Sequence, residues 1–339
     1  MARSRLVIAP NWIGDAVMAV PFLRALRRAY PEDPLAVLAP RGPAAILRAE
    51  GSADAVLLRL SLLADTAAIR HGGFDEAWLL PNSFRAALLA FLGGVPERIG
   101  YATDRRSALL TRTVPPPPRT AHQLRDYDPL LAARGIAPDL EAPRLPIPEG
   151  AARRAAETLA AAGLDGPEPL ALLAPGSAFS RTKRWLPERF GRLGAILRDR
   201  RWACAIVVGP GEETLAREVS AAAGTPLPIL GAALDPLELA ALLARARVAV
   251  ANDSGPMHLA AAVGTPVVAF FGPTDPGRTA PTGAPNRILD RYVFCSPCFL
   301  TECPYGHECM REIEVEDAVR AVEELMGEDR KTGDGRREK

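Results

Sequence analysis

The segment NDSGPMH, residues 252–258, has the residue types and spacing expected of a phosphate-binding helix start. Small residues at the N-terminus of a helix leave backbone N–H groups open to an anion. The same residue types are common N-caps, so Asp253 or Ser254 could serve that purpose alone. His258 falls in the first helical turn, where an imidazolium could donate to a leaving phosphate or the ring could be structural. The candidate ligand-binding residues of this segment are Asp253, Ser254, Gly255, Met257 and His258.

Lys183 lies in a second segment of this kind, SRTKRW, ahead of a helix predicted to begin at Pro187. The chain has 41 basic residues, yet its only other lysines are Lys331 and Lys339 in a polar C-terminal tail. A lysine on a loop can reach a phosphate as a flexible point charge, a task for which arginine is not equivalent. We therefore favour a phosphate ligand over a solvated surface lysine. Ser177 and Arg184 are further candidates for binding a phosphate, and Glu212 is a candidate for another part of the same donor.

The role of Glu212 is open at this point. It follows the GPG turn that ends a predicted strand, where its carboxylate could hold ribose hydroxyls. It could equally be an ordinary acid of the first helical turn, which the helix dipole favours.

Asp15 closes the segment PNWIGD, which follows the first predicted strand and opens a helix. A carboxylate at this position could act as a general base that removes a proton from an attacking sugar hydroxyl. It could equally be an acid that the helix dipole favours. The residue types leave the two roles equally open.

Six arginines and a single acid, Asp104, occupy residues 98–125 of an almost neutral chain. Such a stretch could form an anion-binding face, or an exposed loop of solvated arginines. Few aromatic residues are interleaved with them, so single-stranded nucleic acid is not a favoured partner. The formal net charge of the chain, +1, also excludes a protein that coats nucleic acid through its overall charge.

Four of the five cysteines lie together in the segment CSPCFLTECPYGHEC. Their spacing, C-x2-C-x4-C-x5-C, lacks the two separated knuckles of the usual zinc site. Structural zinc or another metal is therefore one alternative, and free thiols or a disulfide are the other. In either case we expect the cluster to be structural and not catalytic. Its members are Cys295, Cys298, Cys303 and Cys309.

Short apolar runs alternate with longer amphipathic stretches along the chain, which predicts βαβ units and parallel sheets. A length of 339 residues favours two domains. Four prolines crowd residues 138–148, so we expect domains over 1–145 and 146–326, followed by a disordered tail over 327–339 that lacks an apolar face. Six loops follow predicted strands, at the sheet edge where doubly wound domains bind ligands: PNWIGD, PNSF, PGSAFSRTKRW, GPGEE, NDSGPMH and GPTDP. The sequence contains no run of 18 apolar residues, so we expect no membrane-spanning helix.

The predicted strands are Leu6–Ala9, Leu35–Leu38, Ala55–Leu60, Ala77–Leu80, Leu170–Ala174, Ala203–Val208, Val248–Ala251 and Val267–Phe271. The predicted helices are Val17–Tyr30, Phe84–Leu92, His122–Arg134, Pro187–Arg200, Glu212–Ala223, Pro236–Arg245 and Val315–Met326.

The ordered motifs NWIGD, PNSF, PGSAFSRTKRW, NDSGPMH and FFGPTDP resemble glycosyltransferase family 9, the bacterial ADP-heptose:lipopolysaccharide heptosyltransferases, and above all their heptosyltransferase II branch. The similarity covers residues from about Leu6 to about Thr282. It implies an α/β fold of GT-B type, in which two Rossmann-like doubly wound domains face each other across a cleft. The four-cysteine segment is not part of this pattern.

The resemblance also implies a role for each candidate residue. Asp15 becomes the base, Lys183 the diphosphate ligand, and residues 253–258 part of the donor site in the second domain. The first domain is then expected to bind the acceptor. The candidate acceptor-binding residues are Asn11, Asn82, Ser83, Arg105, Arg106 and His122.

We accordingly expect an inverting glycosyltransferase that requires no cofactor and moves heptose from ADP-heptose to the inner core of lipopolysaccharide. Its partners would be the ADP-heptose donor and a lipid A-core acceptor at the inner membrane surface, and not nucleic acid. No export signal is evident, so a cytoplasmic protein in peripheral contact with the inner membrane is expected. A nucleotide-sugar epimerase of the same two-domain architecture and a non-catalytic nucleotide-binding protein are the alternatives.

Overall fold

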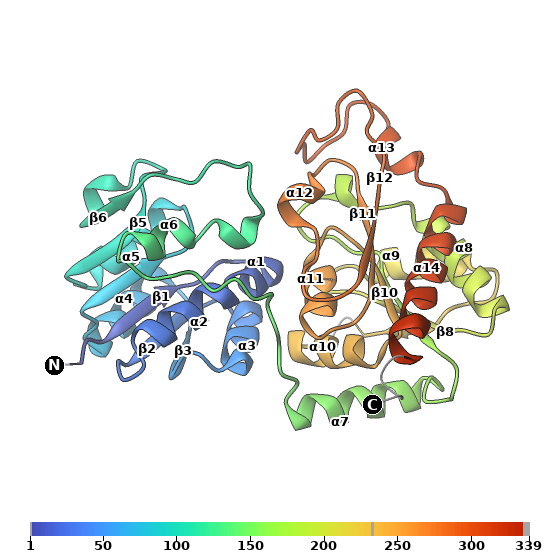
Figure 1. Ribbon diagram of the computed structural model, residues 1–339, viewed down its shortest axis with the longest axis horizontal. Helices are drawn as coiled ribbons and strands as arrows, with labels where there is room; N and C mark the ends of the chain where they lie inside the picture. Colours follow the sequence, from blue (N-terminus) through green and yellow to red (C-terminus); the bar gives the residue numbers. More distant parts are fainter. Residues whose placement is uncertain (1, 232–233, 335–339) are drawn as a thin grey trace. The chain divides into compact units, whose positions relative to one another are not determined.

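The computed structural model describes residues 2–231 and 234–334, with side chains as far as Gly327. The chain divides into two units, Met1–Pro146 and Ile147–Lys339, so the division falls one residue after the expected one. Each unit is built on one six-stranded parallel sheet with helices packed along it (Figure 1).

The strands of the first unit are β1 (Arg5–Ile8), β2 (Leu35–Ala39), β3 (Ala55–Leu58), β4 (Glu76–Leu79), β5 (Glu97–Tyr101) and β6 (Arg112–Val114). Its helices are α1 (Ile13–Met18), α2 (Val20–Ala29), α3 (Arg41–Glu50), α4 (Leu62–Gly72), α5 (Phe84–Leu92) and α6 (Asp128–Ala132), with 3-10 turns η1 (Ser107–Leu109) and η2 (Gln123–Arg125).

The strands of the second unit are β7 (Leu170–Ala174), β8 (Ala203–Val207), β9 (Ile229–Leu230), β10 (Val248–Asn252), β11 (Val267–Phe271) and β12 (Asn286–Asp290). Its helices are α7 (Glu149–Ala161), α8 (Pro187–Asp199), α9 (Glu213–Ala222), α10 (Pro236–Arg245), α11 (Gly255–Ala262), α12 (Pro276–Thr279), α13 (Glu308–Arg311) and α14 (Val315–Asp334), with the 3-10 turn η3 (Arg181–Lys183).

The two sheets have the same connectivity. The first has the strand order β3-β2-β1-β4-β5-β6, and the second has the equivalent order β9-β8-β7-β10-β11-β12. The chain order therefore reverses between β1 and β4 in one unit and between β7 and β10 in the other. This is the doubly wound order, and ligands bind beyond the carboxyl ends of the strands at the reversal. The expectation of an α/β fold with two Rossmann-like doubly wound domains is confirmed.

The apolar residues of β1 separate onto the two faces of the first sheet. Val7 packs with Phe22 and Trp78 in one core cluster, whereas Leu6 and Ile8 belong to the cluster on the other side. This alternation follows from the two-residue period of a strand. Because both faces are covered, β1 is buried along its whole length. Its last three residues, Leu6–Ile8, are apolar, whereas the buried Arg5 is paired with Glu76.

Two expected helices are interrupted in the structure. The helix expected over Val17–Tyr30 is instead the pair α1 and α2, which meet at Ala19. Pro21 lies in the first turn of α2, where its missing N–H costs nothing. The stretch His122–Arg134 likewise divides into η2 and α6, and Pro129 lies in the first turn of α6.

The C-terminal helix is longer than expected. The tail was expected to be disordered from residue 327, but α14 continues to Asp334, and residues 335–339 lie outside the described part. Buried Val315, Val322 and Leu325 anchor the helix to the second unit. Once such a helix is nucleated, each further residue adds a backbone hydrogen bond at little cost, so helical structure extends beyond the apolar face.

Across residues 2–231 and 234–334 we find no helix with the length and apolar character needed to cross a membrane.

Candidate functional site

Lys183 and Asp253 meet at the carboxyl edge of the second sheet. Lys183 ends the turn η3 in the loop after β7, and Asp253 directly follows the neighbouring strand β10. The Lys183 Nζ lies 2.7 Å from Asp253 Oδ2, with side chains 18% and 4% exposed. Two residues that the sequence placed in separate loops are thus brought together at the strand reversal.

The N-terminus of α11 adjoins this ion pair. Ser254 is the N-cap residue, but its side chain makes no capping hydrogen bond, and its Oγ instead donates to the Asn252 carbonyl at 3.2 Å. Pro256 has no N–H, and the Met257 N–H donates within the turn. The N–H groups at the helix start that suit an anion are therefore those of Ser254 and Gly255. Gly255 opens the helix and is partly exposed.

Met257 and His258 lie deeper than the residues before them. Met257 is fully buried, and its N–H donates to the Ser254 carbonyl at 3.2 Å. The expectation that Met257 contacts the donor therefore needs correction, because its side chain is fully buried. His258 is 7% exposed, and its role as a donor-site residue stays a prediction.

Asn252 is a functional candidate that the sequence reasoning missed. The side chain is fully buried, with Oδ1 accepting from the Trp185 N–H at 2.9 Å and Nδ2 donating to the Pro175 carbonyl at 2.7 Å. It thereby joins both ends of the loop after β7 to the end of β10. A polar residue at the end of an otherwise apolar buried strand was the signal that could have identified it.

Arg184, Ser177 and Glu212 form a connected group on the same edge. The Arg184 Nη2 donates to the Ser177 carbonyl and to Glu212 Oε1, both at 3.0 Å, and Glu212 Oε2 accepts from the Gly209 N–H at 3.1 Å. A Cβ on Gly176 would lie 1.9 Å from Glu212 Oε2, so a larger residue there would displace the Glu212 carboxylate. Both carboxylate oxygens of Glu212 thus hold the loops in place, and its contact with ribose stays a prediction.

Asp15 is the third residue of α1, the helix that follows β1. Its Oδ1 accepts from the Gln123 Nε2 at 2.9 Å, a partner that the sequence reasoning did not identify. Burial, and then the charge of Asp15, raise the pKa of Tyr127 well above its usual value. Tyr127 therefore remains a neutral phenol near Asp15 and does not supply a base.

Asn11 and His122 are two of the candidate acceptor-binding residues. Asn11 lies four positions before Asp15 in the sequence, and His122 precedes Gln123, the hydrogen-bond partner of Asp15. Asn11 is exposed, and its Oδ1 accepts from the Arg59 Nη1 at 2.6 Å. The His122 Nδ1 accepts from the Leu124 N–H at 3.2 Å. Their roles in acceptor binding stay predictions.

Arg106 does not belong to an exposed anion-binding face. Its side chain is fully buried, its Nε donates to the Tyr101 carbonyl at 3.0 Å, and its Nη1 donates to the carbonyls of Pro81 and Ser83. The expected acceptor contact through Arg106 is thus corrected. The guanidinium holds the PNSF loop, because its fixed fork of donors can satisfy several carbonyls at once.

The PNSF loop itself is exposed at Asn82 and Ser83. Thr103 Oγ1 donates to the Asn82 carbonyl at 3.1 Å, and Ser83 Oγ caps α5 by accepting from the Ala86 N–H at 3.3 Å. Asn82 and Ser83 therefore remain candidates for the acceptor.

Most of the other arginines of residues 98–125 are also structural. Arg98 donates to the carbonyls of Leu109 and Val95, and Arg125 donates to the Asp139 carbonyl. The Arg112 Nε lies 3.6 Å from Glu97 Oε1, so these two residues form an ion pair. Arg105 is exposed and keeps the expected role as a candidate for an anionic acceptor.

The cysteine cluster offers no metal geometry. All five cysteines have free thiols, and within the described residues no group of three or more His, Cys, Asp or Glu side chains is placed to hold a metal ion. The zinc alternative is therefore unsupported. Burial, and to a smaller extent the neighbouring cysteines, raise the pKa of the Cys309 thiol to about 11.

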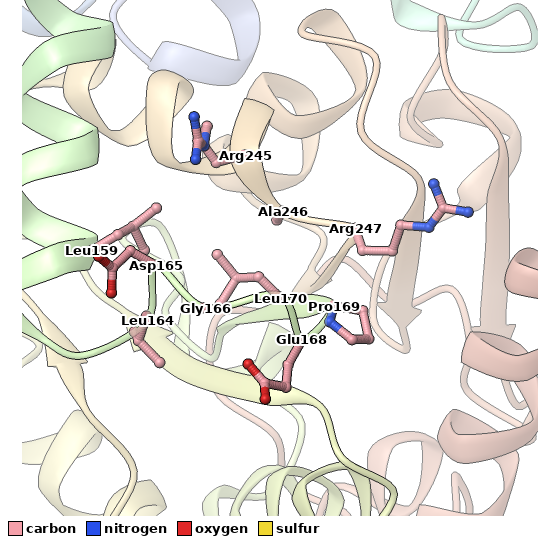
Figure 2. A pocket seen from close by; sticks show the side chains of 10 residues that line it. All are labelled: Leu159, Leu164, Asp165, Gly166, Glu168, Pro169, Leu170, Arg245, Ala246 and Arg247. Carbon is pink, nitrogen blue, oxygen red and sulfur yellow. The ribbon is translucent and has the colours of Figure 1, made fainter.

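A pocket of about 350 Å³ lies at the opposite edge of the second sheet (Figure 2). Its lining includes Pro169 and Leu170 at the start of β7 and Arg247 just before β10. These are the amino ends of the strands, so this pocket is separate from the candidate site.

The sequence profile described as glycosyltransferase family 9 (heptosyltransferase) matches residues 64–308. Lipopolysaccharide heptosyltransferase 2 of Salmonella typhimurium is 28% identical over 305 residues, covering 84% of this chain and 87% of that protein. The protein of the same name from Escherichia coli K12 is 29% identical with the same coverage.

Solved structures of similar fold include the E. coli ADP-heptose lipopolysaccharide heptosyltransferase II. It superposes with a TM-score of 0.83 at 24% identity, covering 96% of this chain and 99% of that one. A glycosyltransferase of family 9 from Veillonella parvula gives a TM-score of 0.83 at 22% identity, with 96% and 98% coverage. These likenesses establish the shared fold.

Proposed function

Because this chain belongs to glycosyltransferase family 9, the heptosyltransferases, we propose that it transfers heptose from ADP-heptose to the inner core of lipopolysaccharide. Family membership does not favour an epimerase or a non-catalytic nucleotide-binding protein. The observation that carries the assignment of the donor site is the Lys183–Asp253 pair beside the N-terminus of α11.

The second unit binds the ADP-heptose. The Lys183 ammonium and the N–H groups of Ser254 and Gly255 at the start of α11 contact the diphosphate, since an anion is favoured at both. As the bond between the anomeric carbon and the β-phosphate oxygen breaks, negative charge grows on that oxygen. The same groups stabilise this charge in the transition state. The remaining donor-site residues are Ser177, Arg184, Glu212, Asp253, Ser254, Gly255 and His258.

The first unit binds the acceptor and supplies the base. Asp15 removes the proton from the acceptor hydroxyl, whose oxygen attacks the anomeric carbon as ADP leaves. Attack on the face opposite ADP inverts the anomeric configuration. Gln123 orients the Asp15 carboxylate through its 2.9 Å hydrogen bond. The acceptor contacts come from Asn11, Asn82, Ser83, Arg105 and His122.

The transfer requires no metal or organic cofactor, since Lys183 and backbone N–H groups supply the positive potential that the leaving diphosphate needs. The acceptor is a lipid A-core molecule, and it is reached at the cytoplasmic surface of the inner membrane. Exposed Arg105 offers a charge of the correct sign for its phosphates.

The proposal is tested by incubating the purified protein with ADP-heptose and a truncated lipopolysaccharide inner core. We expect ADP release and a mass increase of one heptose on the acceptor, with no transfer from UDP- or GDP-linked sugars. Release of free heptose without an acceptor product, or transfer from another nucleotide sugar in preference, would refute it.

A further inference from the structure

The cysteine-rich segment, residues 291–311, is attached to a strand-end loop of the second unit. The Phe299 N–H donates to the Pro273 carbonyl at 2.7 Å, and Ser296 Oγ donates to the Gly272 carbonyl. Both acceptors lie in the loop after β11. A Cβ on Gly272 would lie 2.8 Å from Cys309 Sγ, so the two segments are closely packed. The segment is therefore part of the folded unit at the edge where the donor loops lie.

A second attachment reaches the turn that carries Lys183. The Thr182 hydroxyl donates to the Leu300 carbonyl at 2.7 Å, and the Ser180 hydroxyl lies 3.1 Å from the Thr301 carbonyl. The two hydroxyl oxygens are 2.6 Å apart, and Ser180 Oγ also accepts from the Thr182 N–H at 3.2 Å. Thr182 is 4% exposed and Ser180 is 7% exposed. These buried hydroxyls join η3 to backbone carbonyls that lie between Cys298 and Cys303.

We propose that Thr182 is a positioning residue for donor binding, which fixes the Lys183 backbone by docking η3 on the cysteine-rich segment. The turn has only three residues, too few to hold its own conformation without tertiary contacts. Lys183 has a flexible side chain, so the volume that its ammonium samples is set by where its Cα is held. The cysteine-rich segment thereby contributes to diphosphate binding without touching the ligand. This inference rests on the proposed role of Lys183.

The binding of ADP and of AMP separates this role from a general structural one. Because Lys183 is proposed to contact the diphosphate, a displaced Lys183 should weaken ADP more than AMP. Loss of local packing alone would instead weaken both nucleotides together. The measurement is therefore calorimetric titration of each variant with ADP and with AMP, beside its melting temperature.

Thr182→Val removes the hydroxyl and keeps the shape of the side chain. We expect ADP affinity to fall by about fivefold, the scale of one hydrogen bond, with AMP affinity unchanged. Thr182→Ser keeps the hydroxyl and should restore ADP affinity. In a Lys183→Ala background, Thr182→Val should have no further effect on ADP affinity, because the group through which it acts is gone.

Thr265→Val is the matched control. Thr265 is also buried, and its hydroxyl also donates to a backbone carbonyl at 2.7 Å, that of Leu243. It lies just before β11, at the amino end of that strand. Thr265→Val should lower the melting temperature about as much as Thr182→Val does, without changing ADP affinity. If Thr182→Val does not fold, Ser180→Ala takes its place, because it removes the neighbouring hydroxyl that donates to the Thr301 carbonyl. Its ADP and AMP affinities are then compared in the same way.

The possible failures are distinguishable. If Lys183→Ala leaves ADP affinity unchanged, the proposed donor role of Lys183 is wrong, and this inference falls with it. If Lys183→Ala weakens ADP binding but Thr182→Val does not, or if Thr182→Val weakens ADP and AMP equally, only the positioning role is overturned.

Discussion

Lys183 and Asp253 form an ion pair in which Nζ lies 2.7 Å from Oδ2 and the carboxylate is almost completely buried. The two residues come from loops 70 positions apart in the sequence. The pair places the only lysine ahead of the C-terminal tail beside the start of α11. A carboxylate so little exposed requires a cation, so Lys183 has both a structural partner and a proposed ligand.

Replacing Lys183 with alanine should weaken diphosphate binding by about 1.5–3 kcal/mol, the scale of a charge-assisted hydrogen bond. It should also lower the melting temperature, because Asp253 is left buried without its cation. Adding Asp253→Asn should recover part of the melting temperature but none of the ADP affinity. Calorimetric titration with ADP checks the first effect and a thermal melt the second.

Arg181→Ala is the control for Lys183. Arg181 is an exposed basic residue on the same turn, two positions earlier. It should change neither ADP affinity nor stability appreciably. Equal losses in the two variants would mean that overall charge, and not the Lys183 position, governs binding.

Asp15→Asn should lower turnover by about 10²–10⁴-fold, the usual contribution of a positioned general base. Stability should change by less than about 1 kcal/mol, the usual contribution of an acid at a helix start. The asparagine oxygen can still accept from Gln123, so the local geometry is retained. Steady-state transfer rates and ADP titrations check the prediction. A near-normal rate in a folded variant would show that the base is another residue.

Arg106 and Arg105 are adjacent but should respond differently to substitution. Arg106→Met removes the donors that hold the Pro81 and Ser83 carbonyls, and should destabilise the protein by about 2 kcal/mol or more. Arg105→Ala should leave stability unchanged and raise KM for the acceptor. Denaturant titrations and acceptor kinetics of the two variants check this. A stable Arg106→Met variant would contradict the structural role assigned here.

Cys204 should make stability depend on pH in the alkaline range. Burial raises the pKa of this thiol from its ordinary value near 9 to about 12. A pKa raised on folding means that the native state favours the neutral thiol. Its contribution is therefore complete below about pH 9 and is lost as the pH rises towards about 12.

Melting temperatures of the parent and of Cys204→Ala between pH 8 and 11 provide the measurement. The parent should lose stability more steeply than the variant, since only the parent gains this thiolate on unfolding. Parallel curves would show that Cys204 is not protected by burial. Its reaction with a thiol reagent at pH 8 should also be slow in the native state.

The strands and their order of alternation with helices could be predicted where burial covers both faces of the sheet. Leu170–Ala174 and Val267–Phe271 were predicted with the bounds that the structure has, because a parallel strand covered on both sides is a continuous apolar run. The edge strand β12 was not predicted, since its residues are only partly buried. The pairing of β7 with β10 could not be read from any local pattern.

Local sequence patterns were enough to predict which loops are candidates for the binding site, because glycine, asparagine, serine and aspartate after a buried strand are typical of the binding edge of a doubly wound sheet. These patterns thereby identified Lys183 and Asp253, but not that the two residues form a pair. The burial of Arg106 and the hydrogen bond between Thr182 and Leu300 became evident from the folded chain alone. Composition and periodicity report the chemistry of a side chain and the face of its own element. The partner of a buried polar group comes from a distant part of the chain, and folding alone brings the two together.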